Sequence, residues 1–435
     1  MTGLPKNWVT TTLEDVYTLQ YGKSLTKGVR TSSGSYPVLG SSGIVGSHTS
    51  FLVEGPVVVV GRKGAAGAVI YCKESCWPID TTYFMKPPTG MDARFAAHHL
   101  LYLQLNRLEK STAIPGLSRD DAYALRVTIP PTREQRRIVA KIEELFSELD
   151  KGVEALTTAR EQLKAYRQSV LKHAFEGKMT ANLRPTHKVL RNVRLGDELE
   201  FLTSGSRGWA DYYAKSGDTF IRSQNLKYDR LDLTDIAYVK LPKGNTEGIR
   251  TRVQVGDVLV TITGANVTKT GIVDSNLGAA YVSQHVALCR PRPSIKSRFL
   301  YWYLLSEAHG RRQLNEAAYG AGKPGLNLDN IKSVAISLPS AQEQAIVVER
   351  IEAALSVEQS FSESIDSELQ RTNALRQSIL KRAFSGQLVA QDAADEPASL
   401  LLERIRVERK KTDAKKPGRK TKITGNSKTG KRAIA

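Results

Sequence analysis

The residues best suited to chemistry lie in glycine-rich, polar stretches that occur in both halves of the chain. Arg and Lys side chains suit guanine edges and phosphates, Asn and Gln suit adenine, and glycine lets a backbone approach a groove closely. A solvated turn explains any single stretch more readily, so only their recurrence at matching positions favours a nucleic-acid interface. The candidates are Lys23, Ser41, Ser42, Arg62, Lys63, Arg207, Trp209, Arg222, Gln224, Asn225, Asn266, Lys269, Gln284, His285 and Lys323.

The signatures of common enzyme classes are missing from the sequence. The P-loop pattern fails because Tyr17 stands where its first glycine belongs, ahead of Gly22-Lys23-Ser24. His98 and His99 are adjacent rather than one helical turn apart, which excludes a zinc-protease helix, and no G-x-S-x-G elbow occurs. Neither Pro-Pro pair has the flanking residues that an amino-methyltransferase places beside its target amine. We therefore expect no catalysis by this chain alone.

Composition describes a soluble globular protein, with 40% apolar and 25% charged residues in 435. No apolar run approaches the roughly 18 residues of a membrane span, and the N-terminus lacks a secretory pattern, so we expect a cytoplasmic protein without a membrane partner. Cys72, Cys76 and Cys289 are too few and too irregularly spaced for a disulfide framework or a zinc site. We expect buried or incidental thiols and no bound metal.

The net charge of +19 is unevenly distributed. From Arg404 to Ala435 there are 13 Lys and Arg residues against two acidic residues, which places 13 − 2 = +11 in the last 32 residues. The other 403 residues carry only +8, an excess that permits phosphate contacts without demanding them. The tail is poor in apolar residues, so we expect it to be disordered, as a non-specific polyanion binder or a solubilising end.

Two long helices are expected to position the polar stretches. Residues 129–180 return without a gap as residues 338–389, with 17 identities. Apolar residues follow three-and-four spacing in both copies, each copy starts just after a proline, and each ends at a glycine, Gly177 or Gly386. About 40 residues make a helix about 60 Å long, which cannot bury its apolar stripe alone. We expect the two helices to pair antiparallel; the alternative is that each docks on its own domain or on another protein.

The globular stretches also match each other. Leu13-x-Asp15 corresponds to Leu195-x-Asp197, and Pro115-Gly116-Leu117 to Pro324-Gly325-Leu326, with 27 more residues between these anchors in the second copy. The strands of this framework repeat while the loops differ, which predicts two different targets. The expected fold is therefore mixed α/β, with two globular domains separated by two antiparallel helices. The expected segments are domain 1 at 1–130, helix 1 at 131–180, domain 2 at 181–338, helix 2 at 339–390, and a short charged helix with the basic tail at 391–435.

Across its whole length the chain resembles the specificity subunits of type I restriction-modification systems. The resemblance is carried by residues 36–46 (YPVLGSSGIVG), Gly61–Gly64, the Pro-Gly-Leu segments, residues 129–135 (IPPTREQ) and the paired helix ends R-Q-S-[V/I]-L-K-x-A-F-x-G. It implies two target-recognition domains, each reading one half of a bipartite, asymmetric DNA site, with the helices as a spacer.

The resemblance also implies partners. The helices and domain surfaces would dock two modification (methyltransferase) subunits, which bring S-adenosylmethionine and flip the target adenine, and restriction subunits would add ATP- and Mg-dependent translocation and cleavage. This chain itself would bind no cofactor. The spacer and partner-binding residues would be Glu134, Gln135, Ile142, Leu171, Phe175, Glu343, Gln344, Ile351, Leu380 and Phe384. Two rival interpretations stay open: the recognition part of a self-sufficient methyltransferase-nuclease, and a coiled-coil scaffold without a DNA role.

Overall fold

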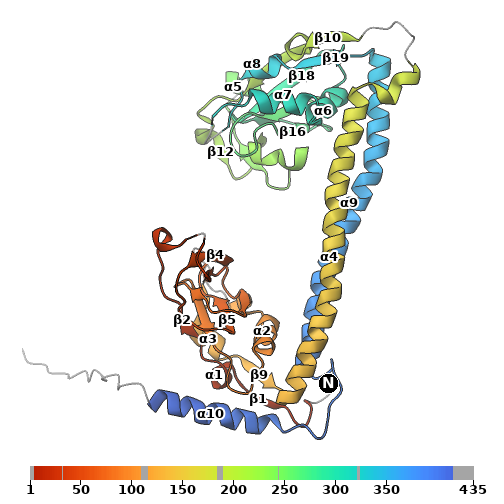
Figure 1. Cartoon of the computed structure of the whole chain (residues 1–435). Coiled ribbons are helices and arrows are strands. Elements are labelled where there is room, and N and C mark those ends of the chain that lie inside the picture. Colours follow the sequence, from red (N-terminus) through yellow and green to blue (C-terminus); the bar gives the residue numbers. More distant parts are fainter. Residues whose placement is uncertain are drawn as a thin grey trace, which may run out of the picture. The chain divides into compact units, whose positions relative to one another are not determined.

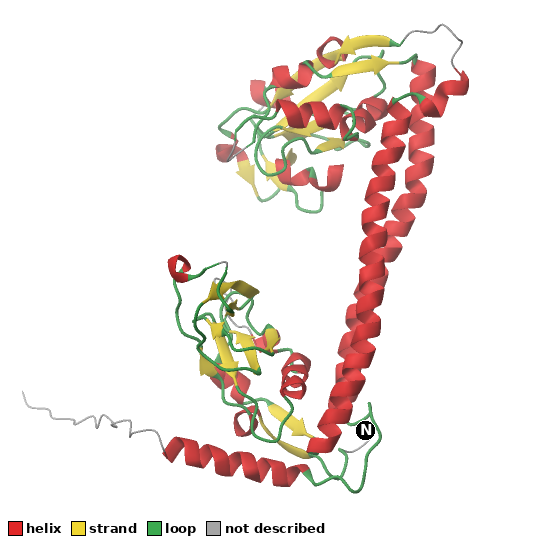
Figure 2. Ribbon diagram, in the orientation of Figure 1, coloured by secondary structure: helices red, strands yellow, loops and turns green. Residues whose placement is uncertain are grey.

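The computed structural model describes residues 4–31, 33–108, 116–183, 190–242, 244–320 and 324–414 (Figure 1). The chain forms two compact units. Unit 1 consists of Met1–Glu154 and Leu369–Ala435, and unit 2 consists of Ala155–Glu368. Each unit therefore contains one globular stretch and the adjoining halves of both long helices. The expected mixed α/β class is confirmed, with strands in both globular parts and two long helices (Figure 2).

Unit 1 contains one antiparallel four-stranded sheet, a smaller three-stranded sheet and a two-stranded ribbon. The larger sheet has the order β2 (Gln20–Tyr21), β8 (Thr82–Met85), β5 (Val57–Gly61), β6 (Val69–Cys72). The smaller sheet has the order β4 (Gly43–His48), β3 (Tyr36–Gly40), β7 (Trp77–Pro78), in which β3 and β7 are parallel. The ribbon pairs β1 (Val9–Thr12) with β9 (Arg126–Ile129). The short helices of this globular stretch are α1 (Leu13–Val16), α2 (Ala93–Tyr102) and α3 (Arg119–Tyr123).

Unit 2 repeats this plan. Its larger sheet has the order β11 (Leu199–Ser204), β18 (Val286–Pro291), β15 (Val258–Thr261), β16 (Thr270–Ile272). Its second sheet has the order β12 (Tyr213–Ala214), β14 (Ala237–Val239), β13 (Asp218–Ile221), β17 (Ala280–Val282), with β13 and β17 parallel. The ribbon pairs β10 (Arg191–Arg194) with β19 (Ala335–Leu338). The helices are α5 (Thr246–Thr251), α6 (Ser297–Leu305), α7 (Gly310–Ala317) and α8 (Leu328–Lys332).

The central strands are apolar on both faces because each face packs on a different core. Val58 and Val60 of β5 join the core that holds α2, while Val57 and Val59 join a second core that includes Leu39 of β3. Successive side chains of a strand point to opposite faces, so four consecutive valines serve two cores at once. In unit 2, two adjacent residues of β15 likewise pack in different cores, Val260 in one and Leu259 in the other.

The long helices are α4 (Thr132–Phe175) and α9 (Ala341–Phe384), each of 44 residues. Ion pairs join Asp150 to Arg376 in unit 1 and Arg160 to Asp366 in unit 2, so a step of ten residues along α4 is a step of ten residues back along α9. The helices therefore pair antiparallel, as predicted. Gly177 and Gly386 follow their ends with φ of 74° and 73°, a left-handed conformation that suits glycine.

The last described element, α10 (Ala398–Ala414), belongs to unit 1 and joins its core through Leu401, Leu402 and Ile405. It corresponds to the short charged helix predicted there. Of the helices in the described part of the chain, none is long and apolar enough to cross a membrane. Cys72, Cys76 and Cys289 are all buried free thiols, as expected.

Candidate nucleic-acid interface

In unit 1, three backbone hydrogen bonds bring separate loops together. The Ile79 amide donates to the Leu39 carbonyl (2.9 Å), the Arg62 amide to the Thr81 carbonyl (2.9 Å), and the Leu117 amide to the Arg62 carbonyl (2.9 Å). These bonds hold the turn after β3, the loop after β5 and the segment before β8 side by side. Gly64 completes the loop with φ of 80°. We call this group of loops cluster 1.

Unit 2 contains the same three bonds. The Ser283 amide donates to the Ile221 carbonyl (2.9 Å), the Ile262 amide to the His285 carbonyl (2.9 Å), and the Leu326 amide to the Ile262 carbonyl (2.8 Å). Gly264, with φ of 95°, takes the place of Gly64. We call this group cluster 2. The two clusters are thus one backbone arrangement built twice.

The side chains on this shared backbone differ. Counted from the matched hydrogen bonds, Gly40 and Ser42 of cluster 1 correspond to Arg222 and Gln224 of cluster 2, and Arg62 corresponds to Ile262. A surface that reads one target twice would keep its contact residues alike. This difference therefore favours two different targets.

Cluster 1 gathers all five of its sequence-predicted residues. The Lys23 amide donates to the Pro78 carbonyl (3.0 Å), which places Lys23 beside the segment before β8. The Arg62 guanidinium donates to the Asp80 carbonyl (2.6 Å from Nη2). Ser41 lies against Gly61 and Gly64. The Lys23, Ser42 and Lys63 side chains are exposed and available to a ligand.

Cluster 2 gathers Arg222, Gln224, Asn266, Gln284 and His285, and adds an acidic residue that the sequence did not single out. Gln224 Nε2 donates to the Asp235 carboxylate (2.6 Å), and Arg222 Nη2 lies 3.5 Å from the same group. Asn266 Nδ2 donates to the Ser223 carbonyl (3.4 Å), and Gln284 Nε2 lies 3.1 Å from His285 Nε2. Asp235 thus orients two of the candidate base-reading side chains before any DNA is bound.

Two predicted contact residues are wrong. The Trp209 side chain is 5% exposed and packs on Phe220, with ring centroids 4.6 Å apart, so it belongs to the core. The Asn225 side chain is 2% exposed and bonds to the backbone at Arg222, Asp232 and Asp235, so it holds the loop rather than a ligand.

The other candidates in unit 2 lie apart from these contacts or outside the described structure. Lys269 is half-buried and paired with Asp229 at 3.5 Å. Arg207 is exposed before Gly208, and it remains a prediction. Lys323 lies outside the described residues.

The ten spacer and partner-binding candidates mostly face the chain's own cores. Glu134 accepts hydrogen bonds from Trp8 Nε1 (3.0 Å) and Gln391 Nε2 (2.7 Å), and burial raises the pKa of its carboxyl. Gln135 and Gln344 each donate to the carbonyl of the proline five residues earlier, both at 3.0 Å. The buried members are Glu134, Gln135, Ile142, Leu171, Gln344, Ile351, Leu380 and Phe384, whereas Phe175 and Glu343 are half-buried. Their packing makes them junction residues, and a partner could touch the buried ones only if that packing opened.

The junction between helix and domain is also duplicated. In unit 1, Arg94 of α2 pairs with Glu143 of α4 (3.0 Å), and in unit 2 Arg298 of α6 pairs with Glu352 of α9 (2.7 Å). The next residue of each short helix packs on the other long helix: Phe95 on Phe384 (5.4 Å between centroids) and Phe299 on Phe175 (5.3 Å). Helices α2 and α6 thus each contact both long helices through two adjacent residues.

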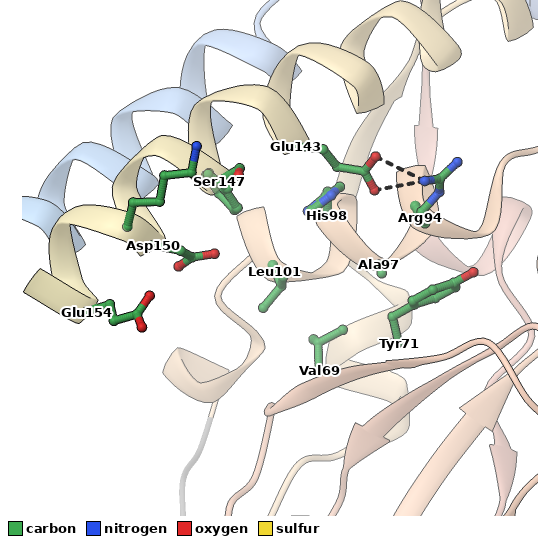
Figure 3. Close-up of a pocket in the computed structure, with 12 residues that line it drawn as sticks. Val69, Tyr71, Arg94, Ala97, His98, Leu101, Glu143, Ser147, Asp150 and Glu154 are labelled. Atoms are coloured by element: carbon green, nitrogen blue, oxygen red, sulfur yellow. Dashed lines mark hydrogen bonds and ion pairs between the residues drawn. The ribbon is translucent and has the colours of Figure 1, made fainter.

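A cavity of about 480 Å³ in unit 1 lies between α2, α4 and β6 (Figure 3). Ala97 and His98 line it, and the positions that match them in α6 are Tyr301 and Trp302. Both aromatic rings are buried, with centroids 4.8 Å apart. At these two positions the repeated frame carries smaller side chains in unit 1 than in unit 2. Within the described residues there is no group of His, Cys, Asp and Glu that could hold a metal ion.

Two loop clusters that share a backbone and differ in side chains define a duplicated recognition protein. A family model described as "Type I restriction modification DNA specificity domain" matches residues 5–158 and 199–371. The chain therefore belongs to the family of type I restriction-modification DNA specificity proteins.

Named relatives agree with this family. The chain is 26% identical over 351 residues to the EcoKI specificity subunit of Escherichia coli K12, covering 76% of this chain and 74% of that one. It is 29% identical over 386 residues to the StySPI specificity subunit of Salmonella potsdam, covering 84% and 82%. A solved structure also has the same fold, from work on complex assembly and conformational transition of the type I R-M system. The two chains superimpose with a TM-score of 0.63 and 18% sequence identity, and the match covers 89% of this chain and 100% of that one.

Proposed function

We propose that this chain is the DNA specificity subunit of a type I restriction-modification complex, in which cluster 1 reads one half of a bipartite DNA site and cluster 2 reads the other. The observation that carries the proposal is the set of three backbone hydrogen bonds repeated in both clusters beneath different side chains. The matched backbones would present loops to DNA in the same way. The different side chains would read different bases, because sequence is read by side-chain contacts to base edges.

The proposed partners are double-stranded DNA, two modification subunits and restriction subunits, with S-adenosylmethionine, ATP and Mg bound by those subunits rather than by this chain. Exposed apolar side chains on the helix pair support docking of other subunits there: Tyr166 of α4 is 47% exposed, and Val357 and Phe361 of α9 are 58% and 59% exposed. Isolated exposed apolar residues are common, but large ones on a helical pair suit a partner helix.

The experiment that tests this function is sequencing of methylated adenines in DNA from cells that carry the chain with its modification subunits. We expect one bipartite motif with a fixed gap. A variant with Gln284→Ala and His285→Ala is expected to change one half of the motif only, because both residues belong to cluster 2. Lys332→Gln, an exposed change on α8, serves as the matched control and should leave both halves unchanged.

Two outcomes would contradict the proposal: the absence of any bipartite methylated motif, or a change in both halves from the cluster 2 variant. Purified chain without partners should transfer no methyl group from S-adenosylmethionine to DNA. Methylation by the chain alone would favour the self-sufficient enzyme instead.

A further inference from the structure

We propose that Arg119 extends cluster 1 by forming, with Arg62 and Tyr21, a site that binds a phosphate or the acceptor edge of a guanine in the first half-site. The inference rests on the proposed function and adds a residue that the loop motifs did not indicate. Both ligands offer two oxygen or nitrogen acceptors to a planar guanidinium, which is the chemistry that arginine recognises best.

The site is built around one exposed aromatic ring. Tyr21 ends β2 with its side chain 53% exposed. The Arg62 guanidinium carbon lies 5.5 Å from the centroid of this ring, and the Arg119 guanidinium carbon lies 5.2 Å from it. Both distances fall within the range of a cation–π contact, so both guanidinium groups contact the Tyr21 ring.

Local structure fixes Arg119 at this place. The bond from the Leu117 amide to the Arg62 carbonyl joins the chain before α3 to the loop after β5. Ser118 then caps α3, its Oγ accepting from the Asp121 amide (3.3 Å), and Arg119 is the first residue of that helix. The Arg119 guanidinium also lies 5.7 Å from the Tyr123 ring, one turn further along α3. The side chain is therefore positioned by tertiary contacts and not free in solvent.

The charge of the site is not neutralised by the protein. Arg62 donates to a carbonyl, that of Asp80, and neither guanidinium has a carboxylate partner among the described residues. The Arg119 Nε atom is buried and has no hydrogen-bond partner. Buried polar groups are nearly always paired, and two like charges at one ring repel each other. An anionic or acceptor-rich ligand would offset the repulsion between the two guanidinium groups.

The three residues of this site occur in unit 1 and are not repeated at the matching positions of unit 2. From the strand registers and the matched bond at Leu117 and Leu326, the positions that correspond to Tyr21, Arg62 and Arg119 in unit 2 are Ser204, Ile262 and Leu328. The shared framework folds with uncharged residues at all three positions. The framework therefore does not require the two cations, and they are best explained by what unit 1 alone must bind.

The test uses the assembled complex with modification subunits and three variants: Arg119→Gln, Arg119→Lys, and Lys86→Gln as the control. Lys86 follows the opposite end of β8 and pairs with Glu54, so its loss removes the same charge from the same sheet away from the site. We expect Arg119→Gln to weaken DNA binding about tenfold or more, and Lys86→Gln to leave it unchanged.

The variants separate the two acceptor sources. For a guanine contact, Arg119→Lys should not restore binding, and the methylated motif should relax at one position of the first half only. For a phosphate contact, Arg119→Lys should restore most of the binding, the motif should stay the same, and Arg119→Gln should lower the slope of log affinity against log salt by about 1.

The inference is overturned if Arg119→Gln matches the wild-type complex in affinity, salt dependence and motif. That result leaves the proposed function standing, because the wild-type complex would still methylate a bipartite site. Failure of the proposed function would appear separately, as the absence of such a motif in the wild-type complex.

Discussion

Asn225 supports the loop of cluster 2, and its removal gives a quantitative test of how far that loop is preorganised. Its Oδ1 accepts from the Arg222 amide (2.9 Å), and its Nδ2 donates to the Asp232 and Asp235 carbonyls (both 2.9 Å). Each bond contributes about 1 kcal/mol net. Asn225→Ala therefore lowers the stability of the held (ordered) loop, relative to the released loop, by about 3 kcal/mol. That corresponds to about a 150-fold change in the equilibrium between held and released loop.

The expected consequence is a selective loss of reading in one half-site. Apparent affinity falls with the fraction of molecules in the competent form, so binding should weaken by up to about 150-fold on a duplex with both half-sites intact. Because Arg222 and Gln224 lose their fixed orientation, the variant should discriminate poorly against a duplex with a scrambled second half. Discrimination against a scrambled first half should stay as in the wild type, since cluster 1 is untouched. Fluorescence anisotropy with the three duplexes measures all of these affinities.

An asparagine that caps another helix supplies the control. Asn327 caps α8, accepting from the Asn330 amide (2.8 Å), and lies in the same unit. Asn327→Ala should cost about 1 kcal/mol of stability through the lost cap and should leave the discrimination between duplexes unchanged. Circular dichroism checks that Asn225→Ala is folded. The reasoning is refuted if the folded variant still discriminates against a duplex with a scrambled second half as the wild type does. It is also refuted if the variant no longer discriminates against a duplex with a scrambled first half.

Two more predictions concern unit 1 and the long helices. Burial lowers the pKa of His98 to about 4 and of His99 to about 3, so the unfolded chain takes up protons near pH 6.5 that folded unit 1 does not. The contribution of these two histidines to the free energy of unfolding should be constant well above pH 6.5 and fall by about 2 kcal/mol per histidine by pH 5. His98→Trp, which introduces the residue of unit 2, should remove the share of His98, about half of that fall, in urea unfolding. An equal fall in the variant and the wild type would contradict the assignment. Inserting four residues into both α4 and α9, at positions that face each other, lengthens the helix pair by about 6 Å. This insertion should change the number of base pairs between the methylated half-sites without changing the sequence of either half-site. An unchanged gap would exclude the spacer role.

The long helices could be predicted from the sequence because the relevant physics is local. Three-and-four spacing, a proline before the first turn and a glycine after the last define a helix without knowledge of the rest of the fold. The start of α4 at Thr132 and of α9 at Ala341, with equal lengths, follows from a repeat without gaps. The alternative of docking on the chain's own domain is also realised, since both helix ends join the unit cores.

The contact residues could be predicted only in part, because residue type does not tell which way a side chain points. Trp209 and Asn225 have suitable types, yet they face inward. Asp235 and Arg119 have no local motif and reach their clusters through tertiary hydrogen bonds and ring contacts. One available signal was the repeat itself: two residues after the matched Pro-Gly-Leu segments stand Arg119 and Leu328, a charge difference on a shared frame.

The duplicated junction explains how such differences can arise without disturbing the spacer. Arg94 and Phe95 connect α2 to both long helices, and Arg298 and Phe299 do the same for α6. These contacts involve different residues from clusters 1 and 2, so the loops can change while each domain stays attached to the helix pair in the same way. By this reasoning a change at the junction should affect partner docking and spacing, whereas a change in a cluster should affect one half-site alone. The internal repeat is therefore a common frame that carries two independent readings.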